Sequence, residues 1–378
     1  MSSESSHRGR VTLRTIAEEV GVDISTVSRT LRRRRSGHAA VTDTARRILE
    51  VADRLGYVRD EYAASLRTQR TAALGVLMPR LSDVVLADLY EVIEDTATQF
   101  GYQTVVANTR DDPQQQRRRI DLMLNRRVDG LILGDARLDS SLLDELAERD
   151  VPFVLVSRRA GDHVAVTIDD HLGGRLAATH LADLGHRRIG ILAGLRYAST
   201  ACDRRDGAVA ALGERGIEVS PQQVAESPNS AAGGYQTALR LLTQDPGITA
   251  LFAVNDFTAI GAMGAIRDLG LQVGRDVAVV GFHDTAVARE LTIPLTSIRT
   301  PLAAMGATAT TTLLARMAGE PVSSVRLSPE LVVRESSDTS VGSAARRSRL
   351  DGPQAIRATA APGQQRHGSA SGRETSVR

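Results

Sequence analysis

The sequence predicts a small all-α region at the N-terminus and a larger α/β region that contains parallel β-sheets. Three short amphipathic helices can be identified before residue 57. From Ala73 onward, apolar runs of strand length alternate with amphipathic helices, which is the order typical of parallel sheets joined by right-handed crossovers. The alternation is interrupted near residues 157–165, so we expect two similar lobes rather than one very wide sheet.

The helices of the N-terminal region are indicated by their caps. Thr12 precedes an apolar stripe that stops at Gly21, and these two residues suit the N-cap and the terminal glycine of a first helix. Asp23 is expected to cap a second helix that continues to about Leu31, and Thr42 is expected to cap a third. The turn between the first two helices is tight enough for a helix-turn-helix, in which the second helix enters the major groove of DNA.

Eight apolar runs in the larger region are predicted to be strands. They lie at residues 74–78, 104–107, 130–133, 153–156, 164–168, 189–193, 250–254 and 277–281. Because open α/β sheets bind ligands at the carboxyl ends of their strands, two facing lobes would form a ligand-binding cleft. We expect a headpiece over residues 11–56, a linker over 57–71, the two-lobed domain over 72–337 and a disordered tail over 338–378.

The formal net charge of +2 conceals an uneven distribution. Residues 1–70 carry +5 and residues 338–378 carry +4, so the residues between them carry −7. Every basic residue is an arginine; a coding bias explains the choice of arginine but not where the positive charge is concentrated. A basic head and tail around an acidic body favour contact of a polyanion by the ends of the chain.

Several classes of function lack support in the sequence. The first ten residues contain no apolar run of the kind found in a secretory leader, and no run approaches the ~20 residues that cross a bilayer. The single cysteine, Cys202, fits a reducing cytoplasm, which is the expected location. No GxxxxGK[ST], HExxH, GxSxG or Cys/His metal spacing occurs, so we expect no catalytic residue, no cofactor and no metal site.

Several segments together resemble the LacI/GalR family of repressors over roughly residues 11–335. They are VTLRTIAEEVGVDISTVSRTL, VTDTARRILEVADRLGY, ALGVLMPRLSD, IDDHLGGRLAATHLADLGHRRIGILAG, ALFAVNDFTAIGAMGAIRDLG, VAVVGFHD and PLTSIR. The resemblance implies a homodimer that binds a near-palindromic operator in double-stranded DNA. It also implies a lactose-repressor-like headpiece, a hinge helix in the minor groove and a two-lobed effector domain of the periplasmic-binding-protein-like (type I) fold.

The candidate DNA contacts come from the outward face of the second helix and from this resemblance. Serine and threonine donate hydrogen bonds to phosphate oxygens, arginine can pair with guanine, and isoleucine can pack on a thymine methyl. The candidates are Thr12, Ile24, Ser25, Thr26, Ser28, Arg29 and Tyr57, with Ala63 and Leu66 in the hinge helix. A leucine there would act as an apolar wedge between base pairs. The chain departs from the family at residues 59–61, where Arg-Asp-Glu replaces a common Pro-Asn.

The resemblance further implies that a small molecule bound between the lobes controls the affinity for DNA. The candidate effector contacts are Val85, Leu86, Thr200, Arg204, Asn255 and His283. His283 stands where the family has an acid, and a histidine becomes cationic below its ordinary pKa of about 6.5. Together with Arg204 it favours an anionic metabolite whose affinity rises as the pH falls from 8 to 6. A sugar-like effector remains the alternative.

Other readings apply to some of these residues and to the whole chain. Asn255 can cap a helix, Asp169 and Asp170 suit a cap pair, and His186 with its arginine neighbours suits a solvated turn. The effector-controlled regulator competes with a solute-binding protein of the same fold, which would have a leader and no headpiece. It also competes with an enzyme, which the absence of catalytic motifs disfavours.

Overall fold

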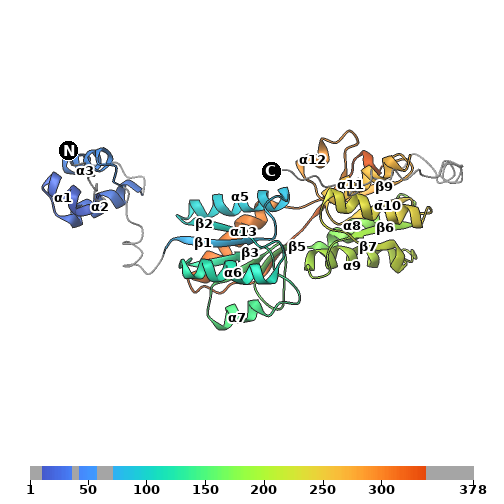
Figure 1. The fold of residues 1–378 in the computed structure, drawn as a ribbon, viewed down its shortest axis with the longest axis horizontal. Coiled ribbons are helices and arrows are strands. Elements are labelled where there is room, and N and C mark those ends of the chain that lie inside the picture. Colours follow the sequence, from blue (N-terminus) through green and yellow to red (C-terminus); the bar gives the residue numbers. More distant parts are fainter. Residues whose placement is uncertain (1–10, 36–41, 58–70, 338–378) are drawn as a thin grey trace, which may run out of the picture. The chain divides into compact units, whose positions relative to one another are not determined.

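The structure is a computed structural model, and it describes residues 11–35, 42–57 and 71–337 (Figure 1). In the first two ranges the chain forms three helices: α1 (Leu13–Val20), α2 (Ile24–Arg35) and α3 (Asp43–Arg54). The predicted caps are confirmed, because the Thr12 hydroxyl accepts a hydrogen bond from Thr15 N and that of Thr42 from Ala45 N. Gly21 ends α1 with φ = 77°, a left-handed conformation that glycine adopts without strain.

The three headpiece helices enclose a small apolar core. Ile16, Val27 and Ile48 contribute one fully buried side chain from each helix. The second helix is longer than its sequence predicts, since it continues to Arg35 rather than ending near Leu31. The extra turn consists of arginines, which have a good helix propensity.

The rest of the described chain contains two six-stranded sheets with the same strand order. The first has the order β11-β5-β4-β3-β1-β2 and the second β12-β10-β9-β8-β6-β7. The strands of the first sheet are β1 (Ala73–Met78), β2 (Gln103–Asn108), β3 (Gly130–Leu133), β4 (Phe153–Val156), β5 (Ala165–Ile168) and β11 (Val325–Leu327). Those of the second are β6 (Ile189–Ala193), β7 (Val224–Glu226), β8 (Ala250–Ala253), β9 (Ala278–His283), β10 (Thr296–Arg299) and β12 (Glu330–Val332).

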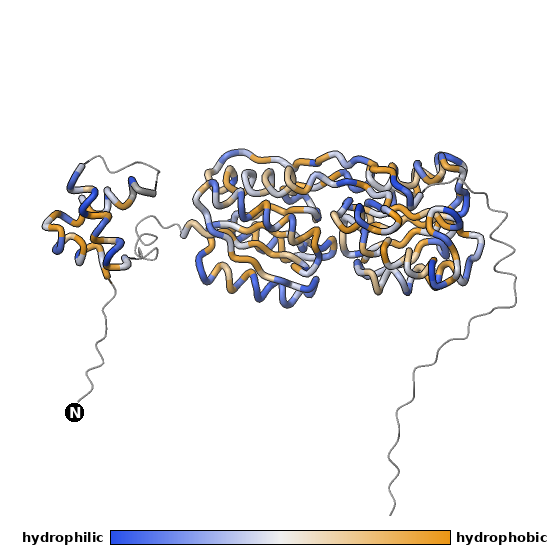
Figure 2. The backbone as a smooth tube through the Cα atoms, turned by 90° about the horizontal axis from the view of Figure 1, so that it is seen from above, coloured by the Kyte–Doolittle hydropathy of each residue, from blue (hydrophilic) through white to orange (hydrophobic). Residues whose placement is uncertain are grey.

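Pairing is parallel for β1–β2, β1–β3, β3–β4 and β5–β11 in the first sheet and for β6–β7, β6–β8, β8–β9 and β9–β10 in the second, whereas β10 and β12 pair antiparallel. The helices that connect the strands are α5 (Val84–Gln99), α6 (Pro113–Asn125), α7 (Leu142–Glu148), α8 (Asp170–Asp183), α9 (Ser199–Gly213), α10 (Ala231–Gln244), α11 (Asp256–Asp268), α12 (Ala286–Arg289) and α13 (Leu302–Met317). Hydrophobic residues are concentrated in the strands of each sheet (Figure 2). None of the described helices is long and apolar enough to cross a membrane.

The two-sheet architecture is confirmed, and the division between compact units falls between Val156 and Ser157, at the start of the predicted break. Strand β5 nevertheless pairs within the first sheet, which the sequence did not predict. The chain folds into two compact units, and the first contains Ser140–Val156 as well as the later segment Gly306–Ser323. The chain therefore returns to the first unit after most of the second has been built. Ser157–Met305 belongs to the second unit.

Four short strands, β7, β10, β11 and β12, were not predicted from the sequence. Each has only three or four residues, and β7, β11 and β12 are at or beside a sheet edge. Strands of this length show too few alternations to be distinguished from loops, because edge positions are partly solvated.

Candidate functional site

The first turn of α2 carries the exposed residues of the predicted DNA-reading surface. The Ile24 side chain is 40% exposed, whereas Val27, one turn later, is fully buried. The Asp23 carboxylate accepts a hydrogen bond from Ser25 N at 2.7 Å. A hydrogen bond from the Ser25 side chain, and then this backbone bond, lower the pKa of Asp23. The turn is thus held with Ile24 directed away from the core.

The other predicted DNA contacts of the headpiece lie either on α2, as Arg29 and Ser28 do, or near the two ends of the headpiece, as Thr12 and Tyr57 do. Arg29 is exposed, and its guanidinium donates to the Ser25 carbonyl at 3.3 Å and reaches the Thr26 hydroxyl at 3.5 Å, so it lies along the start of α2. Ser28 is only partly exposed. Thr12 caps α1, and Tyr57 packs against the headpiece core. Ala63, Leu66 and residues 59–61 lie outside the described residues.

A buried arginine is the centre of the candidate effector site in the second unit. Arg204 is 5% exposed. Its Nε donates to Asp170 Oδ1 at 2.7 Å, and its Nη1 donates to the Val254 carbonyl at 2.7 Å and to His283 Nε2 at 3.0 Å. Its guanidinium also lies 3.7 Å from the centre of the Phe282 ring, a cation–π distance. Arg204 is therefore fixed by partners from α8, β9 and the end of β8.

The pKa values of the ionisable groups in this cluster alter the prediction made for His283. Burial raises the pKa of Asp170 to about 6, although Arg204 opposes the shift. Burial, and then the Arg204 charge, hold the pKa of His283 well below its usual value. Since Nε2 accepts from Arg204, His283 is assigned as neutral with its proton on Nδ1. The expected protonation of His283 between pH 8 and 6 is wrong, because the histidine is desolvated and faces a permanent cation.

Of the other predicted effector residues, Asn255 lies nearest to this cluster along the chain. Its side chain caps α11, as Oδ1 accepts from Phe257 N at 2.8 Å, and its neighbour Val254 supplies the carbonyl bound by Arg204. Thr200 lies one turn before Arg204 in α9. Val85 and Leu86 lie in the first unit, at the start of α5, where Val85 is buried.

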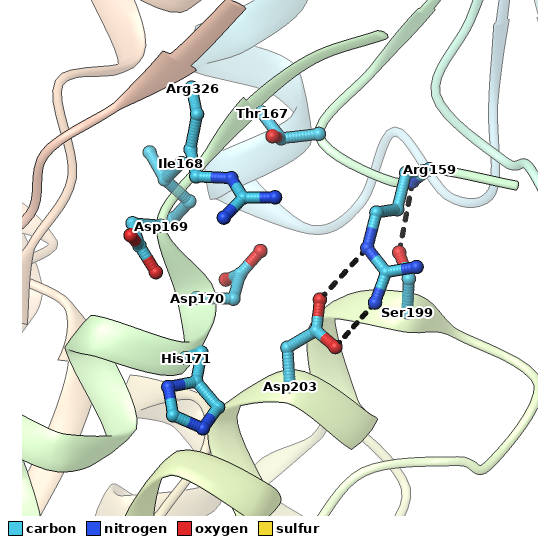
Figure 3. A pocket seen from close by; sticks show the side chains of 9 residues that line it. All are labelled: Arg159, Thr167, Ile168, Asp169, Asp170, His171, Ser199, Asp203 and Arg326. Atoms are coloured by element: carbon cyan, nitrogen blue, oxygen red, sulfur yellow. Dashed lines mark hydrogen bonds and ion pairs between the residues drawn. The ribbon is translucent and has the colours of Figure 1, made fainter. Parts of the chain in front are cut away.

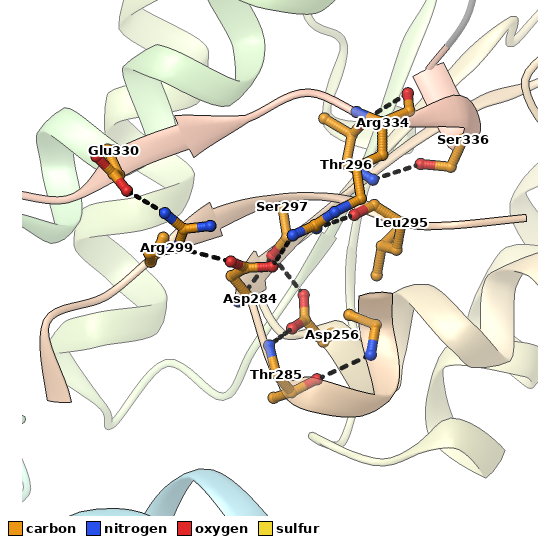
Figure 4. Close-up of polar contacts among 11 residues, drawn as sticks. Asp256, Asp284, Thr285, Leu295, Thr296, Ser297, Arg299, Glu330, Arg334 and Ser336 are labelled. Carbon is orange, nitrogen blue, oxygen red and sulfur yellow. Dashed lines mark hydrogen bonds and ion pairs between the residues drawn. The ribbon is translucent and has the colours of Figure 1, made fainter. Parts of the chain in front are cut away.

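The turn that carries His283 is held by ion pairs and hydrogen bonds of the buried Asp284 (Figure 4). His283 and Asp284 have φ values of 107° and 55°, which non-glycine residues rarely adopt. The Asp284 carboxylate contacts Arg299 at 2.7 Å and Arg334 at 2.6 Å, and its backbone N donates to the Ser297 hydroxyl. These contacts stabilise a strained backbone at the position that orients His283 toward Arg204.

Two residues have roles that the sequence did not reveal. Asp169 alone caps α8, by accepting from Leu172 N, while Asp170 forms the ion pair with Arg204. The only indication in the sequence was that two adjacent acids precede the helix, although one acid is sufficient to cap it.

His186 does not belong to a solvated turn. Its ring is partly buried and forms a hydrogen bond with the Thr249 hydroxyl at 2.9 Å, and burial lowers its pKa to about 4.

The described chain combines a three-helix headpiece that has exposed side chains at the start of α2, two α/β sheets and a buried polar cluster in the second unit, and this combination is typical of a DNA-binding regulator with a ligand-binding domain. A family model described as "Periplasmic binding proteins and sugar binding domain of LacI family" matches residues 71–334. The transcriptional repressor PurR of Pasteurella multocida (strain Pm70) is 30% identical over 330 residues, which are 86% of this chain and 98% of the relative. PurR of Glaesserella parasuis serovar 5 (strain SH0165) is 31% identical over 335 residues.

Solved structures agree with these relatives. The lac repressor dimer bound to operator and the anti-inducer ONPF is 28% identical with a TM-score of 0.78, over 86% of this chain and 99% of that one. The complex of the transcriptional regulator CelR with cellobiose is 29% identical with a TM-score of 0.66, over 86% and 100%. The chain belongs to the LacI family, and it is a transcriptional repressor that binds DNA under the control of a small-molecule effector, not an enzyme.

Proposed function

We propose that the start of α2 reads the operator, with Ile24 and Ser25 toward base edges and Thr26, Ser28 and Arg29 toward phosphates. The observation that supports this assignment is the contrast between exposed Ile24 and buried Val27 within one helical turn. Ile24 is not among the residues that form the headpiece core or pack against it, and an isoleucine exposed in this way suits contact with a thymine methyl. Thr12, Tyr57, Ala63 and Leu66 complete the proposed DNA contacts.

The test is selection of binding sites from random double-stranded DNA with the full chain, followed by footprinting of the selected sequence. We expect a near-palindromic site protected on two half-sites, because family members bind operators as dimers. Recovery of no preferred sequence would contradict the proposed reading surface. We propose that the protein acts in the cytoplasm, on the nucleoid.

We propose that the effector contacts Arg204, Asn255 and His283, with Thr200, Val85 and Leu86 as further contacts. Because Asp170 already balances the charge of Arg204 and His283 is neutral, this cluster favours a neutral polar ligand over an anion. The sugar-like alternative is therefore the proposed class, and the relative CelR was solved with cellobiose.

The effector proposal can be tested by calorimetry with cellobiose, monosaccharides and a matched set of sugar acids. We expect a neutral sugar to bind, to change operator affinity, and to bind more weakly to His283→Ala. Tighter binding of sugar acids than of neutral sugars, with an affinity that rises as the pH falls to 6, would instead support an anionic effector.

A further inference from the structure

A cavity lies within the second unit, and none of the proposed effector contacts lines it (Figure 3). Its volume is about 240 Å³. It is lined by Arg159, Thr167, Ile168, Asp169, Asp170, His171, Ser199, Asp203 and Arg326. Asp170 is the one residue that it shares with the Arg204 cluster, because this carboxylate pairs with Arg204 through Oδ1. Arg204 itself does not line the cavity.

Several polar groups in the cavity wall already have hydrogen-bond or ion-pair partners within the protein. Arg159 forms a two-point ion pair with Asp203, with distances of 2.7 and 3.2 Å, and its backbone N donates to the Ser199 hydroxyl. Asp169 caps α8. These groups shape the cavity without requiring a ligand.

Three other groups in the wall lack such contacts. Thr167 is 8% exposed, yet its hydroxyl has no hydrogen-bond partner in the described part of the chain. Asp170 is 4% exposed and uses Oδ1 for Arg204, which leaves Oδ2 facing the cavity. Arg326 of β11 is exposed, and it has no carboxylate partner among residues 11–35, 42–57 and 71–337. Two largely buried side chains with an uncommitted oxygen, next to a guanidinium with no ion-pair partner, are available to bind a ligand.

The three groups lie close together because of strand register. β11 and β5 pair in parallel with Arg326 opposite Thr167, which places both side chains on the same face of the sheet. Asp170 follows β5 by two residues and begins α8. A guanidinium, a hydroxyl and a carboxylate oxygen therefore converge on one small volume, as Figure 3 shows.

We propose that this cavity is a second ligand site, and that it binds a small zwitterion of the α-amino acid class. The ligand carboxylate pairs with Arg326, its ammonium group donates to Asp170 Oδ2, and Thr167 supplies a further hydrogen bond. A simple anion would face three aspartates and a simple cation two arginines in the lining. A molecule with both charges matches the wall better than either.

Calorimetric titration of the full chain near neutral pH tests the proposal, with each standard α-amino acid as a separate probe. Acetate, ethylamine, inorganic phosphate and glucose serve as matched probes that carry one charge or none. We expect at least one amino acid to bind with one site per chain in a manner that depends on Arg326, and none of the matched probes to bind in that manner. Failure of every amino acid at millimolar concentration, or Arg326-dependent binding of phosphate or glucose, would overturn the assignment.

Variants distinguish this site from the Arg204 cluster. Arg326→Gln and Thr167→Val should each weaken amino-acid binding about tenfold or more, without loss of thermal stability, since neither side chain has an internal partner. Arg289→Gln, an exposed arginine outside the cavity, should leave binding unchanged. His283→Ala should also leave it unchanged. If His283→Ala abolished amino-acid binding and Arg326→Gln did not, the ligand would occupy the effector site and the proposal would be wrong.

Discussion

Ile24 and Val27 lie one turn apart in α2 but have opposite environments, and this contrast can be tested directly. Ile24→Ala should weaken binding to the selected operator by about 1 kcal/mol, within the ~1–3 kcal/mol typical of a lost base contact. The loss should concern one base-pair position in each half-site. The measurement is a shift assay against operators substituted singly at every position.

Val27→Ala is the control for this experiment. Because Val27 is fully buried, its truncation leaves a cavity and should lower the thermal stability of the headpiece by about 1–3 kcal/mol. Its effect on binding should be uniform across operator sequences. Uniform weakening by Ile24→Ala would instead assign that side chain to folding.

His186 makes stability depend on pH in a defined direction. Its pKa in the folded protein is lowered to about 4 by burial, with smaller contributions from His180 and Arg187, so the unfolded chain binds a proton first as the pH falls. Stability should therefore be lost between about pH 6.5 and 4, by roughly 2–3 kcal/mol. His186→Gln should remove this loss, whereas His171→Gln, at an exposed site, should not. Urea denaturation at neutral and acid pH measures the difference.

Sequence patterns identified individual polar residues but not their pairings. Arg204, Asn255 and His283 were predicted because they stand in recognisable motifs. Asp170 was predicted to be a cap, since its ion pair joins residues 34 positions apart and depends on how α8 packs on α9. The charge state of His283 likewise depends on burial beside Arg204. Burial and long-range pairing are properties of the packed molecule, so they could not be predicted from local sequence.

Helices α8 and α9 pack so closely that glycine is required at the contact. A Cβ at Gly207 would lie 2.0 Å from the His171 carbonyl oxygen, and one at Gly174 would lie 1.9 Å from the Arg204 carbonyl oxygen. Gly207→Ala should destabilise the protein by about 2–4 kcal/mol, because backbone must move to admit the methyl group. It should also disturb the Asp170–Arg204 pair and lower effector affinity.

Gly213, at the end of the same helix α9, is the matched control. A Cβ there would meet nothing within 4 Å. Gly213→Ala should be neutral or stabilise the protein by about 0.5 kcal/mol, since alanine reduces the entropy of the unfolded chain. Equal thermal midpoints for the two variants would contradict the close-contact argument.

Among the secondary-structure elements, the length of a strand determined whether it could be predicted from the sequence. All eight predicted strands are present within a few residues, because buried parallel strands are continuous apolar runs. The four strands that were missed are three or four residues long. One of them, β11, carries Arg326, so the cavity that Arg326 lines could not have been predicted either.

The larger domain should fold without the headpiece. Its first residues are anchored by Asp129, whose two carboxylate oxygens accept from Thr71 N at 2.9 Å and Ala72 N at 2.8 Å. A protein that begins at Thr71 should therefore unfold cooperatively and bind the effector, yet lose specific DNA binding. Protection of the operator by this truncated protein in a footprint would disprove the domain assignment.

DNA binding by the whole protein should depend strongly on salt. Each phosphate contact contributes a slope of about −0.9 in a plot of log K against log salt. Arg29→Gln should reduce the magnitude of the slope by about 1 and weaken all DNA sequences alike. Arg267→Gln, in the second unit and paired with Asp268, should leave the slope unchanged. A flat salt response of the unmodified protein would exclude phosphate contacts as a source of affinity.

The return of the chain to the first unit sets an order of events on the ribosome. Strand β3 ends at Leu133, but the residues that cover Gly130 on it, Leu313 and Met317, belong to α13. At about 5–20 residues per second, translation from β3 to α13 takes roughly 10–40 s. During that time the second sheet can form from nearly contiguous chain while the earlier sheet keeps an apolar face uncovered. The half of the nascent protein that is made first thus remains incomplete until α13 has been made, and during that time it is the half that needs protection from aggregation.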